Sequence, residues 1–309
     1  MTDATAHPLR AATRQAVGDD GPVLDVRELR VTTARRSHPL TLVDGISFTI
    51  ARAQRLALVG ESGSGKSLTA LAVMRLLPVG VVARGTVLLD GFDLMRLREA
   101  EMTRVRGGRV AMIYQNPLAA LNPVMTVGAQ LTEAIRAHTP LGRTAARRRA
   151  VDLLGEVGIA HGERRAGAYP HQFSGGMRQR AVIAMAVAAD PELLIADEAT
   201  TALDVTTQAR IVDLLDRICE ERGCAVLLIT HDLGVASSLC SDVQVMYAGR
   251  LVERAEADSF YRRPLHPYSE ALLGSLCRLD IDVDSPIRAI DGQPPVPGRV
   301  PAGCAFHPR

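Results

Sequence analysis

The sequence predicts an α/β protein with a mainly parallel central sheet, a small antiparallel β-subdomain and a helical subdomain. Three observations support this fold class. A short apolar strand, a glycine-rich loop and an apolar helix follow one another in residues 56–77. Strand and helix patterns then alternate from residue 191 onwards, which favours parallel strands joined by helices. Several strand patterns between residues 23 and 50 come before the loop and indicate a second, antiparallel sheet.

The glycine-rich loop matches the phosphate-binding pattern G-x-x-x-x-G-K-[ST] at every fixed position. Its glycines allow positive φ angles, so that the backbone N–H groups turn toward an anion at the helix N-terminus. Lys66 can reach the outer phosphates, and the Ser67 hydroxyl can join a Mg²⁺ shell. We therefore expect ATP and Mg²⁺ as ligands. The residues expected to contact the nucleotide are Gly60, Glu61, Ser62, Gly63, Ser64, Gly65, Lys66, Ser67 and Leu68.

The other elements follow from the spacing of apolar residues and from turn residues. Residues 119–167 show helical spacing without a convincing strand, whereas short apolar runs ending at polar residues indicate buried strands. The predicted strands or strand–turn units are 23–33, 41–50, 56–59, 85–94, 109–117 and 191–204. An amphipathic helix is expected at 208–223, a strand and helix at 225–240, a hairpin at 242–254 and an extended proline-rich tail at 292–303.

Composition restricts the class of protein. Basic and acidic residues nearly balance, 36 against 34, so there is no overall charge that would favour nucleic acid. No apolar run is long enough to span a bilayer. Residues 1–22 contain acids and no apolar core, and we expect a flexible leader rather than a secretory signal. The five cysteines form no C-x-x-C pair and are expected to be reduced.

Polar residues stand where three apolar strands end. In "LLIADE", Asp197 closes a strand and can hold Mg²⁺, while the next residue, Glu198, can orient or deprotonate the attacking water. Gln115 follows another strand and can join the metal shell or contact the water, and His231 in "LLITHD" can donate a hydrogen bond to the γ-phosphate. In open α/β sheets, function gathers at the carboxyl ends of the strands. We therefore expect these four side chains to meet.

A second anion site is predicted where Ser174, Gly175 and Gly176 begin a helix of small and apolar residues. The chain thus has two phosphate-binding helix starts but one complete phosphate loop. A head-to-tail dimer resolves this difference, because the ATP on each loop would be covered by the partner's Ser-Gly-Gly segment. The γ-phosphate would then hold two protomers together, and its loss would release them.

These motifs together resemble the ATPase subunits of ABC transporters. The set comprises Walker A "GESGSGKS", Gln115 of the Q-loop, signature "FSGGMRQR", Walker B "LLIADE", D-loop "TALD" and switch His231. Longer stretches resemble the oligopeptide/dipeptide importer subfamily: "YQNPLAALNPVMTVG", "PHQFSGGMRQR", "DEATTALDVTTQA", "YRRPLHPYSEALL" and "IDGQPPVPGRVPAGCAFHPR". The resemblance implies a P-loop ABC ATPase domain at 23–255, with a helical subdomain at about 116–180, and a C-terminal extension of the oligopeptide-importer type at 256–309.

The resemblance also implies roles and partners. Glu198 would be the catalytic base, His231 the γ-phosphate sensor, and Ser67, Gln115 and Asp197 the Mg²⁺ ligands. Ser174, Gly175 and Gly176 would act on the partner's ATP, with Asp204 in the dimer seam. The expected partners are a second ATPase subunit, related or identical, two polytopic membrane subunits, which would contact the helical subdomain, and indirectly an extracytoplasmic substrate-binding protein. The expected location is the cytoplasmic face of the membrane, with no nucleic acid bound.

Three positions depart from the family pattern. No aromatic residue lies between Val23 and Leu42 to stack on adenine, although Arg35, Arg36 and His38 offer planar side chains. Ala199 stands where the family usually has proline after the catalytic glutamate. Some members carry a C-terminal cysteine cluster for an iron–sulfur centre; Cys304 matches its first position, but one cysteine cannot hold a cluster.

Alternative functions remain open at this stage. The importer could serve nickel or another small solute, because cargo selection resides on another protein. A soluble ABC-type ATPase of nucleic-acid repair or translation usually has two ATPase units or long coiled-coil insertions, and neither pattern is found. A non-hydrolysing regulatory subunit is disfavoured by the intact Glu198 and His231. The basic run at 142–150 indicates a solvated helix face, or else contact with anionic lipid or a partner loop.

Overall fold

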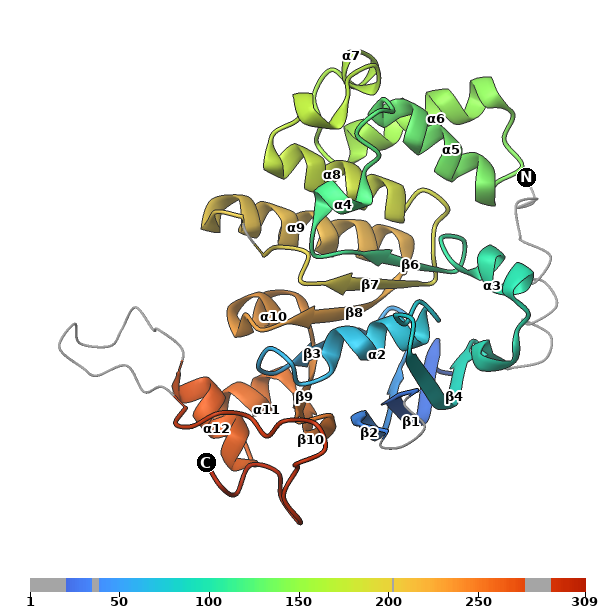
Figure 1. The fold of residues 1–309 in the computed structure, drawn as a ribbon. Coiled ribbons are helices and arrows are strands. Elements are labelled where there is room, and N and C mark those ends of the chain that lie inside the picture. Colours follow the sequence, from blue (N-terminus) through green and yellow to red (C-terminus); the bar gives the residue numbers. More distant parts are fainter. Residues whose placement is uncertain (1–20, 35–38, 202, 276–289) are drawn as a thin grey trace.

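The computed structural model describes residues 21–34, 39–201, 203–275 and 290–309 (Figure 1). Its strands are β1 (Leu24–Thr33), β2 (Thr41–Ile50), β3 (Arg55–Val59), β4 (Val81–Leu89), β5 (Phe92–Asp93), β6 (Val110–Ile113), β7 (Leu193–Asp197), β8 (Ala225–Thr230), β9 (Asp242–Tyr247) and β10 (Arg250–Glu256). Its helices are α2 (Lys66–Val73), α3 (Glu99–Val105), α4 (Pro117–Ala120), α5 (Val127–His138), α6 (Arg143–Glu156), α7 (Gly162–Ala166), α8 (Gly175–Ala186), α9 (Val205–Arg222), α10 (Leu233–Leu239), α11 (Ala257–Arg262) and α12 (Pro267–Gly274), with short 3₁₀ turns η1 (Leu94–Arg96) and η2 (Pro170–Gln172).

The main sheet has six strands in the order β10-β9-β3-β8-β7-β6, and every pair except β10–β9 is parallel. All residues of β7 and β8 are buried, as is typical of parallel strands covered on both faces. Alternate side chains enter two cores: Leu194 and Leu228 pack with the helices, and Ile195 and Leu227 pack toward the second sheet. The predicted parallel sheet is confirmed, and it brings the carboxyl ends of five strands to one edge.

The second sheet is antiparallel, in the order β2-β1-β4-β5, as the strand patterns before the loop predict. Its core also contains residues of α2 and one face of the main sheet, so α2 lies between the two sheets (Figure 1). The strand predicted to start at Gly85 already begins at Val81. This earlier start arises because residues 81–84 pair with β1, beyond a register shift in the ladder.

Helices α5 to α8 gather at the end of the molecule away from the antiparallel sheet (Figure 1). The predicted helical character of residues 119–167 is confirmed. The Thr126 side chain caps α5 by accepting from Ala129 N, and the Ser174 side chain caps α8 by accepting from Met177 N. Because α8 contacts α5, α6, α9 and β6, it connects this helical region to the main sheet.

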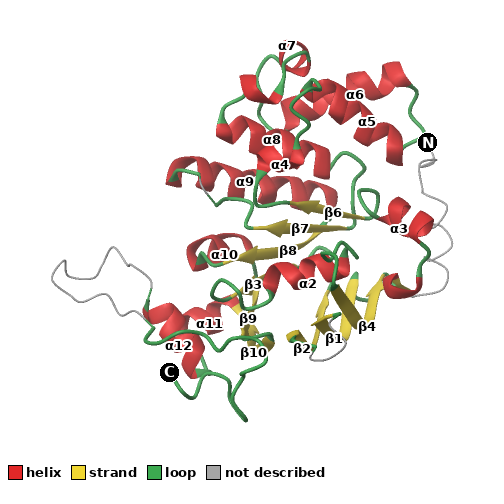
Figure 2. Cartoon of the chain, viewed as in Figure 1, coloured by secondary structure: helices red, strands yellow, loops and turns green. Residues whose placement is uncertain are grey.

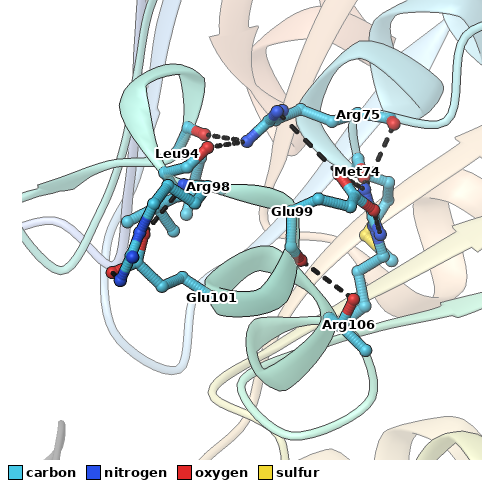
Figure 3. Close-up of polar contacts among 9 residues, drawn as sticks. Met74, Arg75, Leu94, Arg98, Glu99, Glu101 and Arg106 are labelled. Atoms are coloured by element: carbon cyan, nitrogen blue, oxygen red, sulfur yellow. Dashed lines mark hydrogen bonds and ion pairs between the residues drawn. The ribbon is translucent and has the colours of Figure 1, made fainter.

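The C-terminal end of α2 is fixed by two arginines (Figure 3). Arg106 Nε donates to Met74 O at 2.8 Å, and its Nη1 pairs with Glu99 at 2.5 Å. Arg75 donates to the carbonyl oxygen of Leu94 at 3.1 Å. The Arg106 guanidinium thus satisfies a carbonyl that the end of α2 leaves without a partner, whereas Arg75 links that end to the η1 segment. The helix that follows the phosphate loop is therefore tied to α3 and, through it, to the chain leading into β6.

Residues 290–309 contain no helix or strand, in agreement with the predicted tail, but they fold back on the molecule (Figure 2). The Phe306 ring packs edge-on against Tyr247 of β9 at 5.5 Å and against Tyr268 of α12 at 5.3 Å. Aromatic pairs of this geometry favour a defined orientation. This segment is therefore part of the folded unit.

Some expectations concern residues outside the described ranges. No comparison with the structure is possible for residues 1–20 of the leader or for Cys277. The same holds for the planar side chains of Arg35, Arg36 and His38. The other cysteines, Cys219, Cys224, Cys240 and Cys304, have free thiols. Among the described residues, no helix combines the length and the apolar character needed to cross a bilayer.

Candidate nucleotide-binding and hydrolysis site

The phosphate loop joins the end of β3 to the start of α2. Gly60 has φ 147°, and a Cβ there would lie 2.1 Å from Met246 O, so the close approach to β9 requires glycine. Gly63 has φ 78° and has no atom within 4 Å of the position of a Cβ. Gly65, the N-cap of α2, has φ 109°. The loop is thus held tightly at its base and faces open space at its middle, where an anion can approach.

The remaining loop residues divide between the surface and the interior. Ser62 is exposed, and Glu61 is partly buried. Ser64 is buried, and its carbonyl accepts a hydrogen bond from Gly249 N at 2.9 Å. Leu68 packs against the core between the sheets. Only part of the predicted contact set therefore lies on the open side of the loop.

Lys66 is 5% exposed and donates to carbonyls of its own loop. Its Nζ lies 2.7 Å from Gly60 O and 2.9 Å from Glu61 O. Burial lowers the pKa of the Lys66 amine, and nearby carboxylates oppose that effect. A triphosphate offers stronger, charged acceptors than these carbonyls. We therefore expect Lys66 to exchange its loop contacts for phosphate oxygens when a nucleotide binds.

Ser67 and Asp197 bring two oxygen ligands together. Ser67 Oγ at the start of α2 donates to Asp197 Oδ1 at the end of β7, at 3.0 Å. Hydroxyl and carboxylate oxygens are the ligands that Mg²⁺ prefers, and Mg²⁺ commonly takes one or two protein ligands beside substrate phosphates. Asp197 is buried, with 8% of its surface exposed. This donor pair fits the predicted magnesium site.

Glu198 is the centre of a hydrogen-bonded group. Its Oε2 accepts from Gln115 Nε2 at 2.7 Å and from Thr201 Oγ1 at 3.2 Å, and its Oε1 lies 3.2 Å from His231 Nδ1. Its φ of +48° is unusual for a residue other than glycine, and its N–H donates to Ile229 O. Gln115 and His231, predicted from separate strand ends, therefore meet the carboxylate as expected. Positive φ at a non-glycine residue often accompanies functional sites.

The segment Ser174–Gly176 and Asp204 form a second group. A Cβ at Gly176 would lie 2.9 Å from Thr207 Cγ2, so the start of α8 lies against the start of α9. Asp204 caps α9 by accepting from Thr207 N at 2.9 Å, and hydrogen bonds from Thr207 lower the pKa of its carboxyl. Within the described ranges, no hydrogen bond or ion pair joins this group to Lys66, Ser67 or Asp197. The two predicted half-sites thus remain separate in one chain.

Three residues that contact the site do not emerge from the sequence analysis. Thr201 donates to Glu198, as described above. Tyr268 and Arg309, both in the C-terminal extension, contact Glu61 of the phosphate loop. The stretches that hold them were noted as family features, but no local pattern indicates that they reach the loop.

The residues described do not fit an iron–sulfur cluster. The Cys304 thiol is exposed and lies 3.5 Å from His266 Nε2. In the part of the chain that the structure describes, no group of three or more His, Cys, Asp or Glu residues could hold a metal ion. Such clusters need several thiolate ligands, and Cys304 by itself supplies one.

Replacing Asp197 by asparagine should raise the melting temperature of the nucleotide-free protein by a few degrees. Burial raises the pKa of the Asp197 carboxyl; the hydrogen bond from Ser67 opposes this, and the charge of Glu198 adds to it. The charged form is therefore destabilising without a cation, and an amide removes that charge. The measurement is a thermal melt near neutral pH, with and without Mg-ATP, which should no longer stabilise the variant through Mg²⁺.

The matched control is Asp213→Asn, an exposed carboxylate on α9. The destabilisation caused by the Asp197 charge is absent below the ordinary Asp pKa and fully present above the raised pKa of the folded state. The difference in melting temperature between Asp197→Asn and wild type should therefore shrink on acidification. A lower melting temperature for Asp197→Asn at neutral pH would show that the carboxylate is not strained.

Comparisons with protein families identify two matching segments. A family model described as "ABC transporter" matches residues 43–201. A second model, described as "Oligopeptide/dipeptide transporter, C-terminal region", matches residues 252–309. The first contains the phosphate loop, the Ser-Gly-Gly segment and the Asp197–Glu198 pair, and the second contains Tyr268 and Arg309.

Similar proteins of known description cover nearly the whole chain. The oligopeptide transport ATP-binding protein AppD of Bacillus subtilis is 45% identical over 289 residues, which are 93% of this chain and 88% of that protein. The protein OppD of Mycobacterium tuberculosis is 49% identical over 289 residues. This match covers 47% of the mycobacterial protein, so the chain spans about half its length.

Solved structures with the same fold include a dimeric post-hydrolysis state of the ATP-binding cassette MJ0796 bound to ADP and Pi. It has a TM-score of 0.67 and 25% identity and covers 76% of this chain and 98% of that one. The cbiO1 structure from Clostridium perfringens has a TM-score of 0.66 and 24% identity, and covers 78% of this chain and 91% of that one. The α/β fold with its two sheets is therefore confirmed.

Proposed function

This chain belongs to the ABC transporter family of ATP-binding proteins, and from this premise we propose that it is the motor subunit of an importer for di- or oligopeptides. As a member of this family it is an ATPase. The observation that supports hydrolysis most directly is the meeting of Gln115, Glu198 and His231 beside the Ser67–Asp197 pair. The match of residues 252–309 and the names of the relatives support a peptide cargo.

ATP binding is assigned to the loop and the start of α2. Lys66 leaves the carbonyls of Gly60 and Glu61 and neutralises the outer phosphates, while backbone N–H groups of the loop donate to phosphate oxygens. Mg²⁺, held by Ser67, Asp197 and the amide oxygen of Gln115, would offset the charge of the phosphates. The hydrogen bond to Glu198 is donated by Gln115 Nε2, so it leaves the amide oxygen available for the metal.

Hydrolysis is assigned to the group around Glu198. Its carboxylate orients a water and accepts a proton from it, and His231 donates a hydrogen bond to the γ-phosphate. Thr201 holds one oxygen of the carboxylate, and the strand-end position of Glu198 keeps it next to Asp197. Phosphoryl transfer of this kind depends mostly on positioning and charge neutralisation, which these side chains supply from one side of the nucleotide.

The second half-site is assigned to the partner's nucleotide. Ser174, Gly175 and Gly176 would donate to the γ-phosphate bound on a facing loop, and Asp204 would lie in the dimer seam. The separation of the two groups within one chain supports this arrangement, as does the similarity to a dimeric cassette. ATP would close the dimer, and loss of the γ-phosphate would open it. The second ATPase subunit can be an identical or a related chain.

The helical subdomain offers a surface for the membrane partners. A groove of about 890 Å³ lies between α5, α6 and α7 and is lined by both basic and acidic residues, among them Arg143, Arg147 and Glu163. We assign to this groove cytoplasmic loops of two polytopic subunits. The chain would thus lie peripherally on the cytoplasmic face of the membrane, and an extracytoplasmic binding protein would supply the substrate. We also propose the domain boundaries that the family resemblance implies, at residue 23, about 116, about 180 and 256.

Co-purification with the membrane subunits tests this function. The tagged chain, expressed with two candidate polytopic membrane subunits from the same organism, should retain both in detergent and should hydrolyse ATP. Vesicles containing the complex should accumulate peptides when ATP and a peptide-loaded binding protein are supplied. The double variant Arg143→Glu/Arg147→Glu should lose both membrane partners, because it reverses two charges of the groove.

Arg84→Glu on β4 is the matched control, since Arg84 is exposed and far from the groove in the fold. Uptake of nickel in place of peptides would contradict the proposed substrate but would leave the proposed role as an importer ATPase standing. Recovery of the chain with nucleic acid and without membrane proteins would contradict the importer proposal.

A further inference from the structure

Two residues of the C-terminal extension, Tyr268 and Arg309, contact Glu61 of the phosphate loop. Arg309 Nη1 lies 2.9 Å from Glu61 Oε2, and its Nη2 lies 3.3 Å from Oε1, so the guanidinium meets both carboxylate oxygens. Tyr268 Oη accepts a hydrogen bond from the Glu61 backbone N–H at 2.8 Å. The two contacts come from α12 and from the tail, which are far from the loop in the sequence.

All polar groups of Glu61 are therefore engaged. Its N–H is bonded to Tyr268, its side chain to Arg309, and its carbonyl to Lys66 Nζ. When Lys66 turns to a nucleotide, the carbonyl loses its partner, and the other two contacts keep the peptide in place. The loop can thus release its lysine without changing its own shape.

Arg309 is itself held in position. Its side chain is 6% exposed, and it donates to Asp291 O at 2.6 Å and to Tyr247 Oη at 3.3 Å. Its guanidinium carbon also lies 6.0 Å from the centre of the Phe306 ring. Because the planar guanidinium is fixed by several groups, the bidentate contact with Glu61 needs little further ordering.

The charge of Glu61 gives this contact a purpose beyond packing. A carboxylate in a loop that receives a triphosphate repels the ligand. Lys66 alone cannot balance it, since Lys66 must also neutralise the phosphates. A fixed arginine on the far side cancels the carboxylate charge and leaves the positive charge of Lys66 for the nucleotide.

We propose that Arg309 and Tyr268 are positioning residues for ATP, through which the C-terminal extension holds the phosphate loop and neutralises Glu61. This inference rests on the proposed ATP-binding role of the same loop. It gives the extension a direct effect on nucleotide affinity, although neither side chain need touch the nucleotide. Burial raises the pKa of the Tyr268 hydroxyl, so this group stays neutral at physiological pH.

The test measures the Kd for ATP of the full chain with a fluorescent ATP analogue, for wild type and a set of variants. Arg309→Gln leaves the Glu61 carboxylate uncompensated and should weaken binding about tenfold. Glu61→Gln leaves the Arg309 charge uncompensated and should bind ATP at least as tightly as wild type. The double variant has neither charge and should bind like wild type rather than like Arg309→Gln. Arg309→Lys keeps the charge but loses the bidentate geometry, and should bind ATP with an affinity between those of wild type and Arg309→Gln.

Rescue of Arg309→Gln by Glu61→Gln separates charge compensation from a general loss of structure, which a second substitution would not repair. Arg299→Gln, an exposed arginine of the same tail, is the matched control and should bind like wild type. Binding by Arg309→Gln within twofold of wild type, or a double variant as weak as Arg309→Gln, would overturn the proposal. Lys66→Ala separates the two levels of inference: if wild type and Lys66→Ala bind equally, the ATP site itself is wrong.

Tyr268→Phe provides a second measurement, which also serves if Arg309→Gln does not fold. It removes the hydroxyl that accepts from Glu61 N–H and keeps the ring contacts with Tyr247 and Phe306. We expect ATP binding about threefold to tenfold weaker, because a backbone N–H of the loop loses its partner. Unchanged binding in this variant would exclude Tyr268 from the positioning role.

Discussion

Replacing Glu198 by glutamine is expected to lower the rate of ATP hydrolysis by at least about 100-fold while ATP binding stays nearly unchanged. The amide cannot accept the proton of the attacking water, which is the step assigned to this carboxylate. It can still take part in hydrogen bonds with Gln115, Thr201 and His231, so the arrangement of the site is preserved. The measurement is phosphate release by the full chain with its partners, beside nucleotide binding.

The same variant tests dimer closure. If the γ-phosphate holds two half-sites together, Glu198→Gln with Mg-ATP should form a stable dimer, seen by light scattering, whereas ADP should leave it dissociated. Glu220→Gln, an exposed glutamate on α9, is the control and should behave like wild type. Hydrolysis by Glu198→Gln near the wild-type rate would remove Glu198 from the role of base. A failure to associate with Mg-ATP, even with the natural partners present, would contradict the motor.

Replacing Ser174 by arginine is expected to abolish hydrolysis although the chain's own phosphate loop still binds ATP. The larger side chain fills the space at the N-terminus of α8, where the N–H groups of Gly175 and Gly176 would meet the partner's γ-phosphate. It also removes the N-cap, since Ser174 Oγ accepts from Met177 N at 3.3 Å. Thr144→Arg, at the exposed start of α6, is the matched control.

Mixing two inactive chains shows whether Ser174 acts across the interface. A dimer of Ser174→Arg with Lys66→Ala contains one site in which the intact loop of the first chain faces the intact segment of the second. Under conditions in which Glu198→Gln dimerises with itself, equal mixing should restore roughly a quarter of the wild-type rate, because half of the dimers are mixed and each has one complete site. No recovery in the mixture would place Ser174 outside the partner's site.

The phosphate loop shows why part of the site can be predicted from sequence. The strand, the glycines, Lys66 and Ser67 are contiguous, and their conformation depends on local properties such as positive φ at glycine and the start of a helix. The caps Ser174 and Asp204 belong to the same class, because each bonds a backbone N–H three residues ahead. Buried strands such as β7 and β8 are also evident, since they are apolar throughout.

The meeting of Gln115, Glu198 and His231 can be predicted only in part from the sequence. Each follows an apolar strand, so its place at a strand end is predictable, but the neighbours of that strand are not. The order β3-β8-β7-β6 brings the three ends together. The left-handed backbone of Glu198, with its N–H bonded to Ile229 O, has no sign in the sequence. Adenine stacking by Arg35, Arg36 or His38 stays a prediction.

The sequence by itself determined the nucleotide-binding motif, the fold class and the strand ends that carry the polar residues, because these depend on contiguous residues or on a repeating pattern. Only the tertiary structure decided that Arg309 and Tyr268 hold Glu61, 248 and 207 residues away in the chain. A contact at such separation depends on how whole elements pack, which involves the burial of Phe306, Tyr247 and Tyr268 together. The local sequence around Arg309 or Tyr268 does not indicate that packing.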